Sequence, residues 1–236
     1  MEHSILTIPI SSLLLILIPV FVVIFIQYRW SLSYKESIYA VLRMLTQLIL
    51  IGYLLGYIFN SDSFLLVLLI VLIMISLSSW IALRTIIHQR KQQYFYVLIS
   101  IIIGGSPILI LVTQFVLDIS PWYKPQIVIP LAGMIYSNCI NSISLAAERF
   151  YQEIQHNDKQ SARNIAFKTS MIPATNTFFA VGLVALPGMM TGQILSGVDP
   201  LIAVRYQIVV MAMIFGAEGI SSAIYLSLTY RSKDLI

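Results

Sequence analysis

The sequence has little charge, and this scarcity is its most informative property. Only 10% of the 236 residues are charged, whereas soluble domains have roughly 25%. Hydrophobic residues make up 58% of the chain, more than a soluble domain of this size can bury. The composition therefore excludes a soluble enzyme, a disordered protein and a nucleic-acid-binding protein, and it calls for a lipid bilayer as solvent.

The sequence also lacks the motifs of several kinds of site. The single cysteine, Cys139, excludes an internal disulfide. None of the three histidines (His3, His88 and His156) has a second ligand at metal spacing, so no tight structural metal site is expected. A weaker transit site of oxygens, amides and thioethers stays open. There is no Gly-rich nucleotide loop and no protease-like serine, which predicts a non-enzymatic protein without an intrinsic cofactor.

Seven apolar stretches have the length of about 20 residues that a membrane-spanning helix needs. They cover residues 5–26, 40–59, 64–83, 95–117, 126–147, 171–191 and 201–229. The first follows a start without basic residues and exceeds a signal peptide's apolar core, so we expect it to be retained. No repeat divides the chain. We predict an all-α polytopic membrane protein with about seven transmembrane helices, forming a single domain over residues 1–236.

The basic residues alternate between the predicted loops. The first, third and fifth loops and the C-terminal tail hold eleven of the fourteen lysines and arginines. The second, fourth and sixth loops hold only Lys124, with Arg205 just inside the last helix. Because cytoplasmic loops carry the excess of Lys and Arg, the N-terminus is predicted outside the cell and the C-terminus in the cytosol.

Charged side chains inside apolar spans are costly and often functional. Arg43 and Gln47 are four residues apart and share one helix face, which indicates a substrate or gating contact unless Arg43 extends to the lipid headgroups. Glu218 lies well inside the last span. Its carboxyl group could bind a cation, pair with Arg43, be held protonated or make a structural polar contact.

The fifth predicted helix carries a run of polar residues that includes Asn138, Asn141 and Ser142. The two asparagines are three positions apart and face the same way. Such residues line a hydrophilic path or form interhelical hydrogen bonds, which are worth about 0.6–2 kcal/mol each in membranes. The number of polar residues in the run favours a path lining.

One stretch is more specific than composition. Residues 186–195 read LPGMMTGQIL and are followed by Tyr206-Gln207-Ile208. This block resembles the signature of the FetB-type ABC-transporter permeases, a family that includes bacterial iron exporters and plant proteins linked to aluminium tolerance. The match extends upstream through Asn176, and residues 43–48 resemble the family's early Arg-plus-Gln helix.

The resemblance implies a homodimeric permease subunit in the cell membrane, which exports iron or another metal ion. It also implies that a separate cytosolic ABC ATPase binds the ATP. Membrane lipids are the other expected partners. The residues expected to line the translocation path are Arg43, Gln47, Asn138, Asn141, Ser142, Asn176 and Glu218.

The signature also has a physical interpretation. Pro187 removes a backbone donor, and glycines loosen a helix, so the sixth span should break there. Broken helices at membrane depth line cavities or lie against protein. We therefore expect an extracellular gate. Its predicted residues are Pro187, Gly188, Met189, Met190, Thr191, Gly192 and Gln193.

The long cytosolic loop, residues 148–170, is expected to form short amphipathic helices. Apolar side chains at helical spacing suit docking on the ATPase, unless the segment lies flat on the membrane. The residues predicted to dock are Phe150, Tyr151, Ile154 and Ile165. Two other functions stay open, a stand-alone ion-coupled carrier or channel that uses Glu218 and a non-transporting scaffold.

Overall fold

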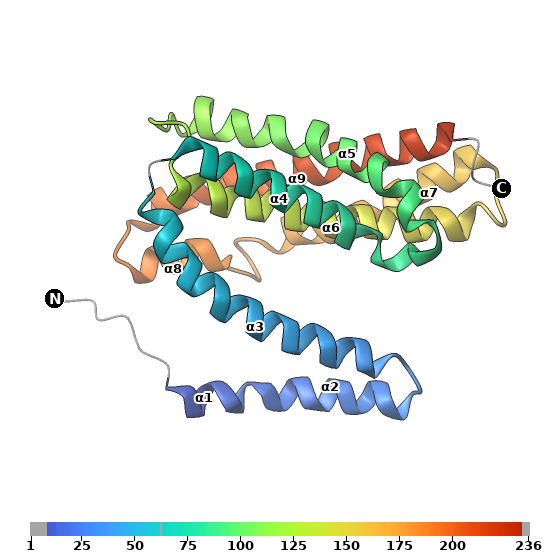
Figure 1. The fold of residues 1–236 in the computed structure, drawn as a ribbon, viewed down its shortest axis with the longest axis horizontal. Helices are drawn as coiled ribbons and strands as arrows, with labels where there is room; N and C mark the ends of the chain where they lie inside the picture. Colours follow the sequence, from blue (N-terminus) through green and yellow to red (C-terminus); the bar gives the residue numbers. More distant parts are fainter. Residues whose placement is uncertain (1–8, 62, 233–236) are drawn as a thin grey trace. The chain divides into compact units, whose positions relative to one another are not determined.

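The computed structural model describes residues 9–61 and 63–232, and both stretches are mostly helical. No β-strand occurs in these two stretches, which confirms the all-α prediction. The chain divides into two compact units, with the boundary between Ser61 and Asp62. Figure 1 shows the helices of each unit. The expectation of one domain over the whole chain stays a prediction.

The first unit is a helical hairpin. It consists of α1 (Ile10–Leu15), α2 (Leu17–Arg29) and α3 (Tyr34–Phe59). Ser31 turns the chain with a positive φ of 56°. The rings of Tyr28 and Tyr34 meet edge to face across the turn, 5.3 Å apart. Residues 5–8 of the first predicted span lie outside the described residues.

The second unit is a helix bundle. Its elements are α4 (Phe64–Ala82), η1 (Leu83–Gln89), α5 (Arg90–Ile110), η2 (Leu111–Val116), α6 (Pro125–Glu153), α7 (Lys159–Ala180), α8 (Gly188–Leu195) and α9 (Pro200–Arg231). Within this unit the long helices run roughly alongside one another, and α9 packs against α5, α6, α7 and α8. Together with α6, which packs against α4, α5, α7 and α9, it forms the centre of the unit.

The helical run from residue 64 to 116 folds back on itself at η1. Ile86 has non-helical backbone angles (φ −119°, ψ 57°), which reverses the chain between α4 and α5. Arg90 closes the turn, because its Nη2 donates to the Trp80 carbonyl at 2.6 Å and its guanidinium lies 3.7 Å from the centre of the Trp80 ring. The reversal yields two packed helices, as the spans predicted at 64–83 and 95–117 require.

Small residues allow α5 and α9 to approach closely. A Cβ atom built on Gly104 would lie 2.7 Å from the backbone nitrogen of Ser221. Nearby, the Ser221 hydroxyl shares a hydrogen bond with the Cys139 thiol of α6 at 3.4 Å. Farther along α9, Thr229 donates to Gln93 of α5 at 3.0 Å. Small-residue contacts and interhelical hydrogen bonds of this kind hold membrane helices together.

Within the described residues, five helical segments are long and apolar enough to cross a membrane. They are Ser12–Arg29, Tyr34–Phe59, Phe64–Val116, Pro125–Glu153 and Pro200–Arg231, and the third contains both α4 and α5. The sixth predicted span, residues 171–191, is not a single helix. It is divided between the end of α7 and the start of α8, with residues 181–187 between them.

Residues 148–170 differ from the predicted short helices. They comprise the last turns of α6, a brief turn and the first half of α7. Asp158 caps α7 by accepting from the backbone nitrogens of Gln160 and Ser161. Hydrogen bonding by Ser161 holds the pKa of the Asp158 carboxyl below its usual value. The sequence pattern could not reveal this arrangement, because two long helices that continue past the membrane carry the same apolar spacing as short separate ones.

The close contact at Gly104 leads to a testable prediction. Gly104→Ala should lower the free energy of unfolding by about 1–3 kcal/mol, because the added methyl group meets the backbone of Ser221 and forces α5 and α9 apart. Thermal unfolding in detergent measures the effect. Gly133→Ala is the matched control, since its Cβ would meet only the flexible end of Met74 at 3.6 Å. Equal stability of the two variants would contradict the prediction.

Candidate functional site

A polar cavity lies between α6, α7 and α9. It has a volume of about 130 Å³, and its polar lining comes from Asn138 and Asn141 of α6, Thr177 of α7 and Glu218 of α9. Met211 and Phe178 are among its apolar neighbours. Three of the predicted path residues, the two asparagines and the glutamate, thus line one cavity.

Glu218 is the charged group of this cavity. Its side chain is only 6% exposed, and no hydrogen bond or salt bridge to it is found among the described residues of the second unit. Asn138 donates its amide to the Met134 carbonyl at 2.8 Å, which leaves its oxygen to accept or to bind a cation. A buried carboxyl that its own unit leaves without a partner is costly, so a ligand, a proton or the predicted pairing with Arg43 is needed to balance it.

Helix geometry explains why these groups meet and why Ser142 does not join them. Asn138 and Asn141 share a face of α6. Ser142 is turned away from the cavity lining and is buried. Its hydroxyl lies 3.3 Å from the backbone carbonyl oxygen of Cys139 and 3.5 Å from the backbone carbonyl oxygen of Glu218. Ser142 therefore holds α6 against α9 and makes no direct contribution to the cavity.

The remaining predicted path residues are not among the side chains that line the cavity within the second unit. Asn176 is exposed on α7, and its neighbour Thr177 lines the cavity in its place. Arg43 and Gln47 lie one turn apart on α3, in the first unit. The pairing of Arg43 with Glu218 would join the two units and stays a prediction. The sequence does not identify Thr177 as a cavity residue, because helical periodicity does not determine which face of α7 turns toward α6 and α9.

The cavity's donors suit a cation. Carboxylate and amide oxygens bind hard and borderline metal ions, and the thioether of Met211 adds a soft donor. Across the described residues, no group of three or more His, Cys, Asp or Glu side chains gathers to hold a metal ion. A set with a single carboxylate binds weakly, which suits a transit site better than a structural one.

The signature residues form a break followed by a short helix. Gly182 has a φ of +82°, a conformation that favours glycine, and the Ala180 carbonyl accepts from the nitrogens of Val184 and Ala185. Pro187 then precedes α8 with an extended backbone. The predicted break is confirmed, although it lies upstream of Pro187, and the role of a gate stays a prediction.

The gate residues face two further cavities of the second unit. Met189 and Gln193 line a cavity of about 540 Å³ that also contacts α6 and α9. Pro187 and Met190 line another, of about 390 Å³, between α7, α8 and α9. The Thr191 hydroxyl donates to the Pro187 carbonyl at 3.1 Å. The two glycines of α8 meet no heavy atom of the described residues within 4 Å of an added Cβ, so they mediate no close packing among these residues.

The predicted docking residues are less accessible than the sequence suggested. Phe150 is fully buried in the core of the second unit. Tyr151, Ile154 and Ile165 are half-buried. The apolar spacing that predicted an exposed docking face directs Phe150, Tyr151 and Ile154 toward the core of the second unit instead. The exposed residues at the tip of the hairpin are polar.

Comparison with known proteins places the chain in a family. The sequence profile of the Uncharacterised protein family (UPF0014) matches residues 10–233. The chain belongs to this family. Membership agrees with the resemblance inferred from the signature and covers both structural units.

Several UPF0014 relatives have similar lengths. The UPF0014 membrane protein slr1647 of Synechocystis is 37% identical over 80% of this chain and 79% of its own. The probable iron export permease protein FetB of Escherichia coli is 32% identical, covering 94% of this chain and 90% of the relative. Protein ALUMINUM SENSITIVE 3 of Arabidopsis thaliana is also 32% identical, covering 87% of this chain and 80% of the relative. No solved structure matches the chain. This chain is therefore a multi-pass membrane protein of the UPF0014 family.

The cavity around Glu218 predicts weak cation binding. With Mn²⁺ as the probe, Glu218→Gln should reduce the affinity for the ion at least about tenfold, since even residues that only hydrogen-bond to a metal ligand often contribute that much. Binding should strengthen as pH rises, because a cation competes with the carboxyl proton. Calorimetry on the purified chain measures both effects.

Ser142→Ala is the matched control for this measurement. Ser142 is next to Asn141 in the sequence, yet it does not line the cavity. Unchanged Mn²⁺ affinity in Glu218→Gln, or an equal loss in Ser142→Ala, would contradict a cation site at this place.

Proposed function

We propose that this chain is the membrane-spanning permease subunit of an ABC transporter. It exports iron or another metal ion, as a homodimer energised by two copies of a separate cytosolic ATPase. The N-terminus lies outside the cell and the C-terminus in the cytosol. The observation that carries the proposal is the cavity lined by the Glu218 carboxyl, which has no partner among the described residues of the second unit, in a family with a relative named as a probable iron export permease.

The distribution of charge in the second unit supports the proposed orientation. The turn at η1, the α6–α7 hairpin tip and the end of α9 lie at one end of this unit (Figure 1). Arg163 stacks on Tyr230 there, 5.1 Å from the ring centre, and joins the start of α7 to the end of α9. Arg84, Arg90 and Arg149 belong to the same elements. A concentration of basic side chains at one end fits a cytosolic face.

The α6–α7 tip is the ATPase docking surface in this proposal. Gln155, His156 and Asn157 are exposed at the turn. The two long helices that meet at this turn, α6 and α7, also supply side chains that line the Glu218 cavity. A displacement of the tip by the ATPase would therefore move the walls of the cavity. Phe150, which is buried in the core, is not part of the surface; Tyr151, Ile154 and Ile165 contribute only their exposed edges.

An ion-coupled carrier or channel is the alternative. The same Glu218 carboxyl could take up and release a coupling proton while it alternates between the two sides. The two mechanisms differ in their need for ATP. Metal transport by the purified chain alone in vesicles with an ion gradient would favour the carrier, whereas transport only with ATP and a partner subunit would favour the permease.

Co-purification tests the proposed partner. Mild-detergent purification of the tagged chain from its native membrane should recover an ABC ATPase in stoichiometric amount. Replacing Gln155-His156-Asn157 by Gly-Ser-Gly should abolish recovery, because it removes the exposed contacts while it leaves the Asp158 cap in place.

The control for this experiment is an equivalent change at the other end of the unit. Replacing the exposed Trp122 by Gly should leave ATPase recovery intact. If no ATPase is recovered with the unaltered chain, or if the tip variant retains it, the proposed docking is wrong.

A further inference from the structure

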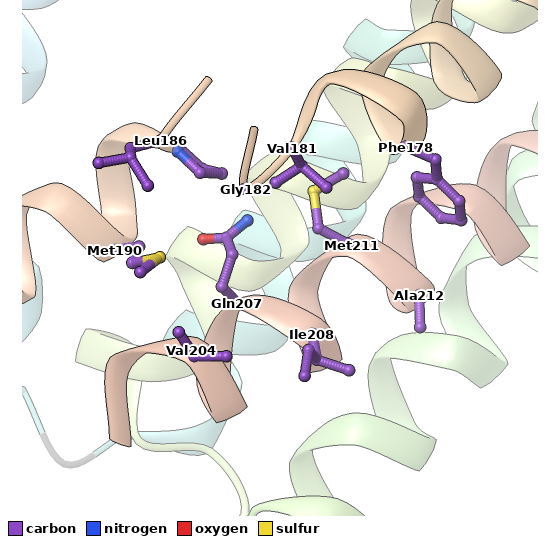
Figure 2. Close-up of a pocket in the computed structure, with 11 residues that line it drawn as sticks. Phe178, Val181, Gly182, Leu186, Met190, Val204, Gln207, Ile208, Met211 and Ala212 are labelled. Carbon is purple, nitrogen blue, oxygen red and sulfur yellow. The ribbon is translucent and has the colours of Figure 1, made fainter. Parts of the chain in front are cut away.

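The cavity between α7, α8 and α9 differs in character from the one around Glu218. Its volume of about 390 Å³ lies within the range of about 300–1,000 Å³ that is usual for small-molecule sites. Figure 2 shows that its walls are almost entirely apolar, with side chains such as Val181, Leu186, Val204 and Ile208. Such walls suit a hydrocarbon ligand.

One polar side chain projects into this apolar space. Gln207 rises from α9 toward Gly182 and Leu186, between Met190 and Met211 (Figure 2). It is only 6% exposed, and its Oε1 atom is buried without a hydrogen-bond partner in the described residues. A buried carbonyl oxygen without a donor is costly, so the cavity is completed by a ligand that brings a hydrogen-bond donor.

The rim of the cavity is apolar as well. Leu186 is 63% exposed and Ile208 is 63% exposed. The neighbouring break adds Leu183 and Val184, whose side chains are almost fully exposed. In a bilayer such side chains contact acyl chains, so a lipid chain reaches this cavity sideways without crossing water.

A metal ion is a poor match for the same cavity. The side chains lining it include no carboxylate, imidazole or thiol, and the thioethers of Met190 and Met211 are its only soft donors. Its neighbour around Glu218 shares Phe178 and Met211 with it but has the opposite chemistry. The two cavities are therefore built for different ligands.

We propose that the cavity between α7, α8 and α9 binds a single-chain amphiphile of the membrane. Its acyl chain lies among the apolar walls, and a hydroxyl group donates to Oε1 of Gln207. Binding of the amphiphile at this cavity does not depend on the proposed transport function. Because Pro187 and Met190 form part of the wall, the bound molecule also holds the start of α8 against α9.

Photolabelling of the full chain in detergent tests the proposal. The probe is a monoacylglycerol with a diazirine in its acyl chain, and a second probe has both glycerol hydroxyls methylated. Peptide mass spectrometry should find the adducts on residues 178–190 and 204–212. Gln207→Leu should weaken labelling by the hydroxyl probe about two- to tenfold, the worth of one hydrogen bond, and leave the methylated probe unchanged.

Val204→Phe provides an independent variant, because the added ring fills the cavity. It should reduce labelling of these peptides to background. Ile220→Phe is the matched control, since Ile220 is exposed on the same helix and does not line the cavity; it should label like the unaltered chain. Thermal unfolding shows whether each variant is folded.

Three results would overturn the proposal. The first is labelling spread evenly over the apolar helices and unaffected by Val204→Phe. The second is an equal response of both probes to Gln207→Leu. The third is a disulfide between Leu186→Cys of one copy and Val204→Cys of another, formed in the membrane and blocking the label, since it would show that a second copy fills the cavity.

Discussion

The close approach of α5 and α9 is the contact on which the second unit depends. Hydrocarbon solvates leucine as well as a protein interior does, so apolar burial alone gives membrane helices little reason to associate. Gly104 removes the side chain that would otherwise separate the two backbones at Ser221. The Ser221 hydroxyl then reaches Cys139 and adds α6 to the contact. This junction fixes the rotation of α9, and with it the direction of Glu218, which lies less than one turn away.

Once α9 is fixed, the part of its surface next to Ser221 faces two environments. Gln207, Met211 and Glu218 are spaced by four and seven residues and follow one stripe toward α7. At one end of the stripe Glu218 meets the asparagines of α6. At the other end Gln207 stands among apolar side chains. Met211 contributes to both cavities, so a movement of α7 along this stripe alters both of them.

The break between α7 and α8 is compatible with a membrane because its backbone groups find partners within the chain. The Ala180 carbonyl accepts from the nitrogens of Leu183, Val184 and Ala185, and the Gly182 nitrogen donates to the Ala185 carbonyl at 3.0 Å. Non-helical backbone at membrane depth requires such compensation. Only glycine adopts the positive φ at residue 182 without strain. The break creates the space that α8 encloses, which a continuous helix would fill.

The sequence by itself determined that the protein is helical and lies in a membrane, because this follows from its composition and from the length of its apolar runs. The same features gave most of the spans and the polar character of α6, and one specific motif gave the family. It also placed Asn138, Asn141 and Glu218 among the functional candidates. Only the tertiary structure decided which of these residues meet. Helical periodicity gives the residues that share a face but not the helix that this face contacts. Packing therefore placed Ser142 at the interface between α6 and α9, left Asn176 exposed and buried Phe150. It also placed Thr177 and Gln207 in the walls of cavities, which no local sequence pattern indicates.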